Sequence, residues 1–198
     1  MKMVEKTTLS ERINHLVLAL SFFVLVLTGF GFAFNSLNWI TRIFGGGAAA
    51  ATIHEWGGVV FLLSLVITVG SYFNESISFG EEDRAWIRLR GGYLDRHVEL
   101  PPQGRLNFGQ KMFYLFGVLA SGLVVSASGF MIWGHSGVLL GHILHNLAFF
   151  VMVSFIPVHL YLATAANPGT FRVMTRGTVP LAWARKHHAK WVKDMKLE

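Results

Sequence analysis

Four long apolar runs separated by polar segments dominate the pattern of hydrophobic and polar positions along the chain. No Asp, Glu, Lys or Arg occurs between Ile13 and Thr41 or between Met112 and Phe171. A bilayer core about 30 Å thick needs roughly 20 consecutive apolar residues in a helix, so these runs predict transmembrane helices. We place the spans at about residues 15–34, 52–73, 112–133 and 141–165. The prediction is an all-α membrane protein, a four-transmembrane-helix bundle forming a single integral membrane domain over residues 1–198.

The segments outside the spans are interpreted as extramembrane. The first apolar run is longer than the apolar region of a signal peptide, so we expect a retained helix. Residues 35–51, which end in the tract GGGAAAA, are expected to form a loop with room for a short interfacial helix near Trp39. Residues 74–110 are expected to form a polar loop with one short helix around residues 84–90, and residues 170–198 a basic tail.

The distribution of positive charge predicts the topology. Of 17 Lys and Arg residues, 16 lie in the N-terminal segment, the 74–111 segment and the tail, and only Arg42 lies on the opposite side of the predicted spans. The positive-inside rule therefore places both termini and the middle loop in the cytoplasm. The net charge of +6 is thus a topology signal rather than an indication of nucleic-acid binding.

The composition restricts the chemistry that the chain can perform. Its residues are 53% hydrophobic and 14% charged, which is typical of membrane proteins. With no cysteine there is no disulfide, no thiolate metal site, no set of ligands for an iron-sulfur cluster and no attachment site for covalent haem. A redox centre must then be held by histidine or methionine. No pattern predicts hydrolytic or group-transfer catalysis, and we predict no catalytic residue.

The fourth run carries His145 and His159, fourteen residues apart. In a helix this spacing turns the two side chains about 40° apart and separates them by roughly 21 Å. The distance is too long for one shared metal ion, but it suits two large cofactors stacked across the membrane. The predicted topology places His54 at the level of His145, near the outer face, and His15 at the level of His159, near the cytoplasmic face.

Each predicted pair suits the axial ligation of one haem b, with an imidazole from a different helix on each side of the ring. Ionisable residues inside a membrane are costly and are functional candidates by default. For any single histidine, a hydrogen bond to a neighbouring helix is the alternative. Five glycines either give clearance to a macrocycle or serve helix packing: Gly29, Gly57, Gly58, Gly122 and Gly129.

Several other polar residues have two interpretations each. Arg12, one turn before His15, either pairs with a haem propionate or is only a positive-inside charge. Glu55 either orients a ligand or faces a periplasmic partner. His142 is an alternative to His145 as a ligand, but it lies about 100° away from the helix face that His145 shares with His159. The remaining histidines are expected to be solvated or to act as interfacial anchors: His97, His135, His187 and His188.

Several short motifs extend the argument beyond the histidines. They are RINH at residues 12–15, the IH of the second span, GRLNFGQKMF at 104–113, GFMIW at 129–133, H-x13-H followed by LYLA in the fourth span, and the tail WARKHHAKW. With four histidines on apolar helices in this order, the chain resembles the cytochrome b (gamma) subunit of membrane-bound formate dehydrogenases over nearly its whole length.

The resemblance implies two b haems on His15, His54, His145 and His159. It also implies a menaquinone or other quinone site by the cytoplasmic haem, with Asn107 and Gln110 as contacts and His159 beside them. The residues alone would make Asn107 and Gln110 a helix cap and a surface amide.

The implied function is that of the quinone-reducing subunit of a formate dehydrogenase in the bacterial cytoplasmic (inner) membrane. Electrons would come from a periplasmic iron-sulfur (beta) subunit and, through it, from a catalytic subunit containing molybdenum or tungsten. Formate would be oxidised on that other chain, and a homotrimer of the complex would fit the family.

Three alternatives stay open at this point. The first is a cytochrome b subunit of a related hydrogenase or of a thiosulfate or polysulfide reductase. The second is a transporter or metal-binding membrane protein that uses the histidines directly. The third is a membrane anchor without a redox role.

Overall fold

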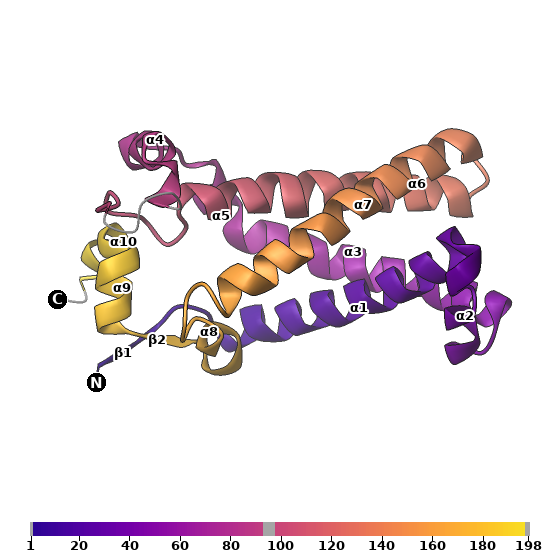
Figure 1. Cartoon of the computed structure of the whole chain (residues 1–198), viewed down its shortest axis with the longest axis horizontal. Helices are drawn as coiled ribbons and strands as arrows, with labels where there is room; N and C mark the ends of the chain where they lie inside the picture. Colours follow the sequence, from indigo (N-terminus) through magenta and orange to yellow (C-terminus); the bar gives the residue numbers. More distant parts are fainter. Residues whose placement is uncertain (1, 93–97, 197–198) are drawn as a thin grey trace. The chain divides into compact units, whose positions relative to one another are not determined.

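The computed structural model describes residues 2–92 and 98–196, and His97 therefore lies outside the described residues. Within them, four long helices dominate the chain (Figure 1). They are α1 (Leu9–Ala33), α3 (Gly47–Ile77), a third span from Phe108 to Trp133 and α7 (Val138–Ala163). All four are long and apolar enough to cross a membrane. The predicted all-α, four-helix membrane fold is thus confirmed, while the side on which the termini lie stays a prediction.

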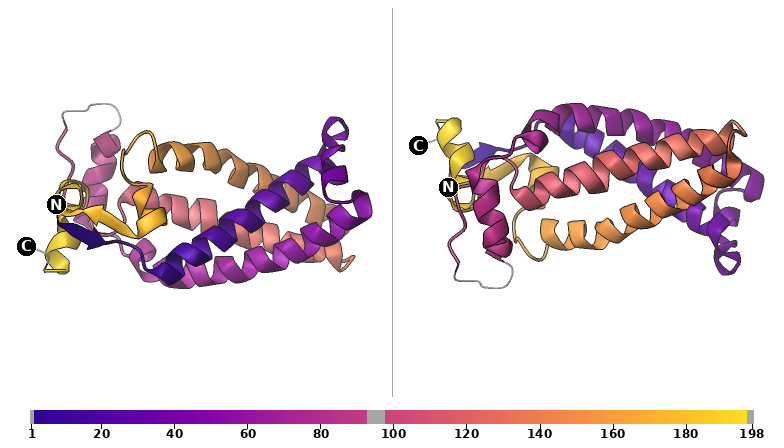
Figure 2. Two further views of the ribbon diagram at one scale, coloured as in Figure 1. Left: turned by 90° about the horizontal axis from the view of Figure 1, so that it is seen from below. Right: turned by 90° about the horizontal axis from the view of Figure 1, so that it is seen from above.

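The third span is not uniform along its length. It consists of α5 (Phe108–Met112), a π-helical segment η3 (Phe113–Ala120) and α6 (Ser121–Trp133). Residues 134–137 join α6 to α7, which turns back against it (Figure 2). Pro157 lies inside α7, where it removes one backbone donor from the helix.

Short elements fill the remaining segments. They are β1 (Met3–Glu5), η1 (Asn35–Leu37), α2 (Ile40–Ile43), α4 (Glu81–Arg88), η2 (Arg90–Gly92), α8 (Arg172–Arg176), β2 (Thr178–Pro180), α9 (Leu181–His187) and α10 (Ala189–Asp194).

Two segments of the chain compare directly with the sequence predictions. The alanines of GGGAAAA belong to α3, so their assignment to a loop is wrong; alanine has the highest helix propensity and extends the second span toward its N-terminus. The helix expected around residues 84–90 is present as α4. It starts earlier because the Asp83 carboxylate accepts a hydrogen bond from the Gly80 backbone N–H at 2.8 Å.

The chain divides into two compact units. The helical unit comprises residues 13–71 and 117–158, and the terminal unit comprises residues 1–12, 72–116 and 159–198. Each unit has its own cluster of buried hydrophobic side chains.

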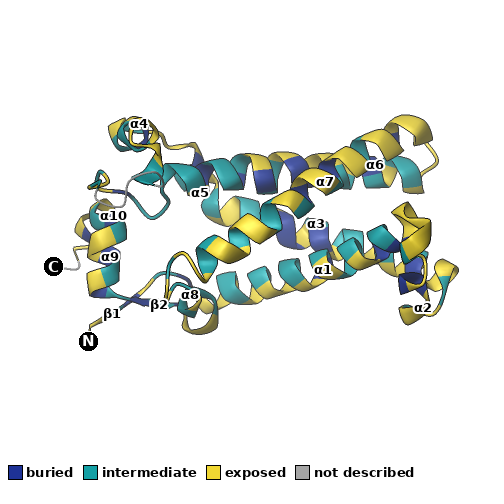
Figure 3. Ribbon diagram, in the orientation of Figure 1, coloured by how far each residue is buried: buried dark blue, intermediate teal, exposed yellow. Residues whose placement is uncertain are grey.

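The core of the helical unit forms around Phe61, Leu65 and Met152, with partly buried residues of the other helices packed against them. A polar contact ties α1 to α3, since the Asn14 amide donates to Thr68 Oγ1 at 2.8 Å and accepts from Ser64 Oγ at 2.8 Å. Many large apolar residues of the long helices are exposed. Figure 3 shows exposed residues along each of these helices. This distribution is expected of helices that face lipid.

The terminal unit brings together the two ends of the chain. Strands β1 and β2 pair antiparallel, with Val4 opposite Val179. Both valines are buried in a cluster that α9 and α10 complete with Leu181, Ala184, Trp191 and Val192. The basic tail thus folds onto the N-terminal segment.

His188 is buried in this unit, with only 2% of its surface exposed. Its Nδ1 lies 2.7 Å from the Gly104 carbonyl oxygen and must donate to it, so Nε2 accepts from Lys6 Nζ at 2.7 Å. Burial and the charge of Lys6 lower the pKa of His188 to about 3, and burial followed by the charge of Arg105 lowers the pKa of Lys6 to about 7. The prediction of a solvated or interfacial His188 is wrong, because the far end of the chain supplies its partner.

Candidate functional site

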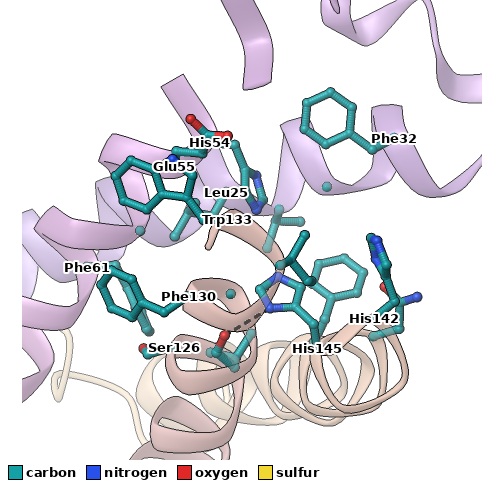
Figure 4. Close-up of a pocket in the computed structure, with 18 of the residues that line it drawn as sticks. Leu25, Phe32, His54, Glu55, Phe61, Ser126, Phe130, Trp133, His142 and His145 are labelled. Carbon is teal, nitrogen blue, oxygen red and sulfur yellow. Dashed lines mark hydrogen bonds between the residues drawn. The ribbon is translucent and has the colours of Figure 1, made fainter. Parts of the chain in front are cut away.

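A cavity of about 510 Å³ lies inside the helical unit. All four long helices contribute to its wall, which is mostly apolar, and both His54 of α3 and His145 of α7 project into it (Figure 4). This volume is within the range of about 300–1,000 Å³ that is typical of small-molecule and cofactor pockets.

The hydrogen bonds of His145 fix its tautomer. Its Nδ1 lies 2.9 Å from the carbonyl oxygen of Val125 and 3.3 Å from Ser128 Oγ. A carbonyl oxygen can only accept, so Nδ1 carries the proton. The Nε2 atom of the neutral ring then keeps a lone pair, as a metal ligand requires.

His54 has a side-chain hydroxyl beside its Nδ1 atom in place of a carbonyl. Its Nδ1 lies 2.7 Å from Thr28 Oγ1. The hydroxyl of Thr28 has one hydrogen, which it donates within its own helix to the Val24 carbonyl at 2.8 Å. In the tautomer that leaves the Nε2 lone pair of His54 free for a metal, Nδ1 donates to Thr28 Oγ1.

The separation of the two rings agrees with ligation from opposite sides of one metal. An imidazole nitrogen binds a transition metal at about 2 Å, so two axial nitrogens stand about 4 Å apart and their ring centres about 6 Å apart. The ring centres of His54 and His145 are 6.1 Å apart, with the planes inclined at 59°. The residues present thus fit a group that takes one nitrogen ligand on each side.

The five candidate glycines differ in whether they line the cavity. Gly29, Gly58 and Gly129 line the cavity. A Cβ on Gly29 would lie 3.7 Å from His54 Cε1, and one on Gly129 would lie 3.4 Å from His145 Cε1. Gly57 and Gly122 instead pack against Leu25 and Leu65, respectively, and serve helix contacts.

Further polar groups line the same cavity. Ser126 Oγ is buried there and has no hydrogen-bond partner among the described residues, so it is available to a polar atom of an occupant (Figure 4). Glu55, His135 and His142 also contribute to the wall. His142 therefore reaches the cavity, although its position on α7 differs from that of His145.

The two histidines of the predicted inner pair belong to different units. His15 lies on α1 in the helical unit, and His159 lies on α7 in the terminal unit. The His159 ring stacks on Phe113 of the π-helical segment, with ring centres 5.2 Å apart and planes at 9°. π-helical turns are frequent at functional sites. The pairing of His15 with His159 stays a prediction.

Asn107 and Gln110 form a capping box at the start of the third span. Gln110 N donates to Asn107 Oδ1 at 2.9 Å, and Asn107 N donates to Gln110 Oε1 at 3.0 Å. The helix-cap interpretation of Asn107 is confirmed, and Gln110 is both exposed and part of the cap. These two bonds use the amide oxygens, so they leave the NH₂ groups to donate to an acceptor such as a quinone carbonyl.

Arginines of the terminal unit hold backbone and carboxylate groups. Arg12 donates to the Thr175 carbonyl at 3.0 Å, and its role toward a propionate stays a prediction. Arg105, which was not among the predicted site residues, bonds Glu11 at 2.9 Å and Glu75 at 3.2 Å. Its place in the GRLNFGQKMF motif was the only signal that could have singled it out.

Comparison with known proteins identifies the family of the chain. The family model described as prokaryotic cytochrome b561 matches residues 6–177. The chain is 30% identical to the formate dehydrogenase cytochrome b556(fdo) subunit of Escherichia coli (strain K12), over 98% of this chain and 93% of the relative. It is 28% identical to the formate dehydrogenase cytochrome b556 subunit of Haemophilus influenzae, over 92% of this chain and 79% of the relative. The resemblance inferred from the motifs is confirmed, and the chain belongs to the prokaryotic cytochrome b561 family.

Proposed function

We propose that this chain is the membrane electron-transfer subunit of a formate dehydrogenase complex, and that it holds two b haems and reduces quinone. The observation that carries the proposal is the His54–His145 pair. Both rings project into one cavity, have centres 6.1 Å apart and bond their Nδ1 atoms to the protein. Haem b, when bound, supplies a one-electron redox centre.

The residues of the helical unit would bind and orient this outer haem. His54 and His145 would provide the axial nitrogens, and Gly29, Gly58 and Gly129 would leave room for the macrocycle. The apolar wall of the cavity would exclude water from the ring, which is one means by which a protein sets a redox potential.

A second haem on His15 and His159 completes the proposal. It is supported by the spacing of His145 and His159 along α7 and by the stacking of Phe113 on the His159 ring. Asn107 and Gln110, at the start of the third span, would donate amide hydrogens to a quinone near the cytoplasmic surface. Arg12 would lie near a propionate of this inner haem.

The proposed partners follow from the relatives, which are named as subunits of formate dehydrogenases. We infer an iron-sulfur subunit on the periplasmic side as the electron donor and a molybdenum- or tungsten-containing subunit that oxidises formate. The positive-inside distribution of Lys and Arg supports cytoplasmic termini in the bacterial inner membrane. A homotrimer of the whole complex is part of the same proposal.

The experiment is a reduced-minus-oxidised absorption spectrum of the purified chain, with haem quantified against protein. Wild type is compared with His145→Ala and with His142→Ala, which removes another cavity histidine three residues away on α7. We expect two haems b per chain in wild type and in His142→Ala, and one in His145→Ala.

The alternatives give different results. Folded wild-type protein without haem would refute the electron-transfer function and would return the histidines to transport or packing. Equal haem content in His145→Ala and wild type would refute the assignment of the outer ligands. Formate-dependent quinone reduction by the whole complex then tests the donor and the acceptor separately from the haem content.

A further inference from the structure

Thr28 contacts the ring of His54 through its hydroxyl. It lies on α1, is fully buried, and places its hydroxyl oxygen 2.7 Å from His54 Nδ1 on α3. The Thr28 hydroxyl can donate to the Val24 carbonyl at 2.8 Å, so when Nε2 of His54 binds a metal, this oxygen accepts from the protonated Nδ1. A threonine in an apolar helix commonly bonds the carbonyl four residues earlier, but here the same oxygen also serves a neighbouring helix.

The two cavity histidines differ in what holds them. His145 donates to a backbone carbonyl, that of Val125, at 2.9 Å, with Ser128 Oγ more distant at 3.3 Å. His54 Nδ1 instead contacts a side-chain hydroxyl, that of Thr28, at 2.7 Å. A substitution can therefore remove the partner of His54 while the backbone partner of His145 remains.

We propose that Thr28 is a positioning residue that fixes the Nδ1–H tautomer of His54 and thereby lowers the redox potential of the outer haem. This inference rests on the proposed function, in which His54 is an axial ligand. An acceptor on Nδ1–H makes the imidazole more basic at Nε2. A more basic ligand stabilises oxidised iron, which carries one more positive charge than reduced iron.

Removing the acceptor has a defined consequence. In Thr28→Val the side chain keeps its branched shape but loses the oxygen, so His54 Nδ1–H loses this acceptor in a buried position. The ligand becomes less basic, and the balance between reduced and oxidised iron shifts toward the reduced form. At the wild-type midpoint potential, we expect the ratio of reduced to oxidised iron to increase about tenfold. For a one-electron couple this equals a rise in the midpoint potential of about 59 mV.

The test is a mediated redox titration of the purified chain, followed by the visible spectrum of each haem. Thr28→Ser keeps the hydroxyl and controls for the loss of a methyl group. Ser21→Ala is the matched control on α1, seven residues earlier, because the Ser21 hydroxyl donates to the Val17 carbonyl at 2.8 Å in the same manner. We expect one haem to shift upward in Thr28→Val and neither to shift in Thr28→Ser or Ser21→Ala.

The other outcomes of the redox titration either support or overturn the role of Thr28. Loss of one haem in Thr28→Val, with two retained in both controls, also supports the positioning role, since the hydroxyl would then be needed to hold the ligand. The inference is overturned if the titration of Thr28→Val coincides with that of wild type, or if Thr28→Ser shifts by the same amount as Thr28→Val. In either case, two haems per chain would leave the proposed function intact. Wild-type protein without haem overturns both.

Discussion

Replacing Lys111 by methionine is expected to destabilise the terminal unit strongly. The Lys111 ammonium donates to Asp83 Oδ2 at 2.8 Å and to the Ser78 carbonyl at 2.6 Å. The side chains of Lys111 and Asp83 are only 7% and 3% exposed. The ion pair is therefore removed from water and joins α5 to α4.

The magnitude follows from the group left behind. Removing one partner of a buried ion pair costs about 3–5 kcal/mol, because the other charge stays buried without compensation. Asp83 Oδ2 keeps the hydrogen bond from Gly80 N at 2.8 Å, which favours the lower end of that range. A loss of about 3 kcal/mol corresponds to a fall in unfolding temperature of about 6–12 °C for a chain of this size.

The assay is thermal unfolding of the purified protein in detergent, with two further variants. Lys190→Met removes an exposed ion pair with Glu82 of the same helix α4 and should cost less than about 1 kcal/mol. The double variant Lys111→Met with Asp83→Asn keeps an acceptor for Gly80 and removes the orphaned charge, so it should recover at least half of the loss. A Lys111→Met protein as stable as Lys190→Met would refute the reasoning.

Three further predictions concern the tail, the cap and the cavity. The pKa of His188 is lowered from 6.5 to about 3, so the unfolded chain binds more protons than the folded chain between these values, and stability should fall as the pH falls from about 6.5 toward 3. At pH values above the carboxylate range, hydrogen exchange of the β1 and β2 amides, corrected for its intrinsic pH dependence, should show this loss in wild type, and His188→Gln should reduce it more than His187→Gln does, because the pKa of His188 is the more strongly lowered. Asn107→Ser keeps a capping oxygen but removes the amide donor, so it should raise the KM for quinone without changing stability. An unchanged KM would show that Asn107 only caps the helix and does not contact quinone. Gly129→Val should lower the haem content at the outer site, because its Cβ would already contact His145 Cε1 at 3.4 Å, whereas Ala127→Val in the same helix should retain both haems.

The features that the sequence predicted well are those encoded by local pattern. Long uncharged runs predict membrane helices because each residue of such a helix meets the same apolar solvent. The placement of His54 and His145 in one cavity also agrees with the spacing argument, which needed only the helical period and the order of the spans. In the same way, the Asn107 cap was predictable from its position before an apolar run.

The features that the sequence did not reveal depend on distant partners. The burial of His188 requires Lys6, which lies 182 positions earlier, and no local signal in a basic tail indicates such a contact. The pairing of β1 with β2 involves three residues on each side, too few for a recognisable alternation. Thr28 resembles other hydroxyl residues in apolar helices, and only the position of His54 distinguishes it.

The GRLNFGQKMF segment shows why a shared motif needs a structure before it assigns chemistry. Asn107 and Gln110 cap the third span, and Lys111 forms the buried ion pair with Asp83. These contacts give each of the three residues a folding role that does not require a quinone. The cap nevertheless fixes the amide groups of Asn107 and Gln110 at the start of the span, on the same helix whose π-helical segment carries Phe113 against His159. A quinone contact would therefore use side chains already held by the fold, so a variant such as Asn107→Ser, which keeps the cap, separates recognition from folding where alanine would remove both.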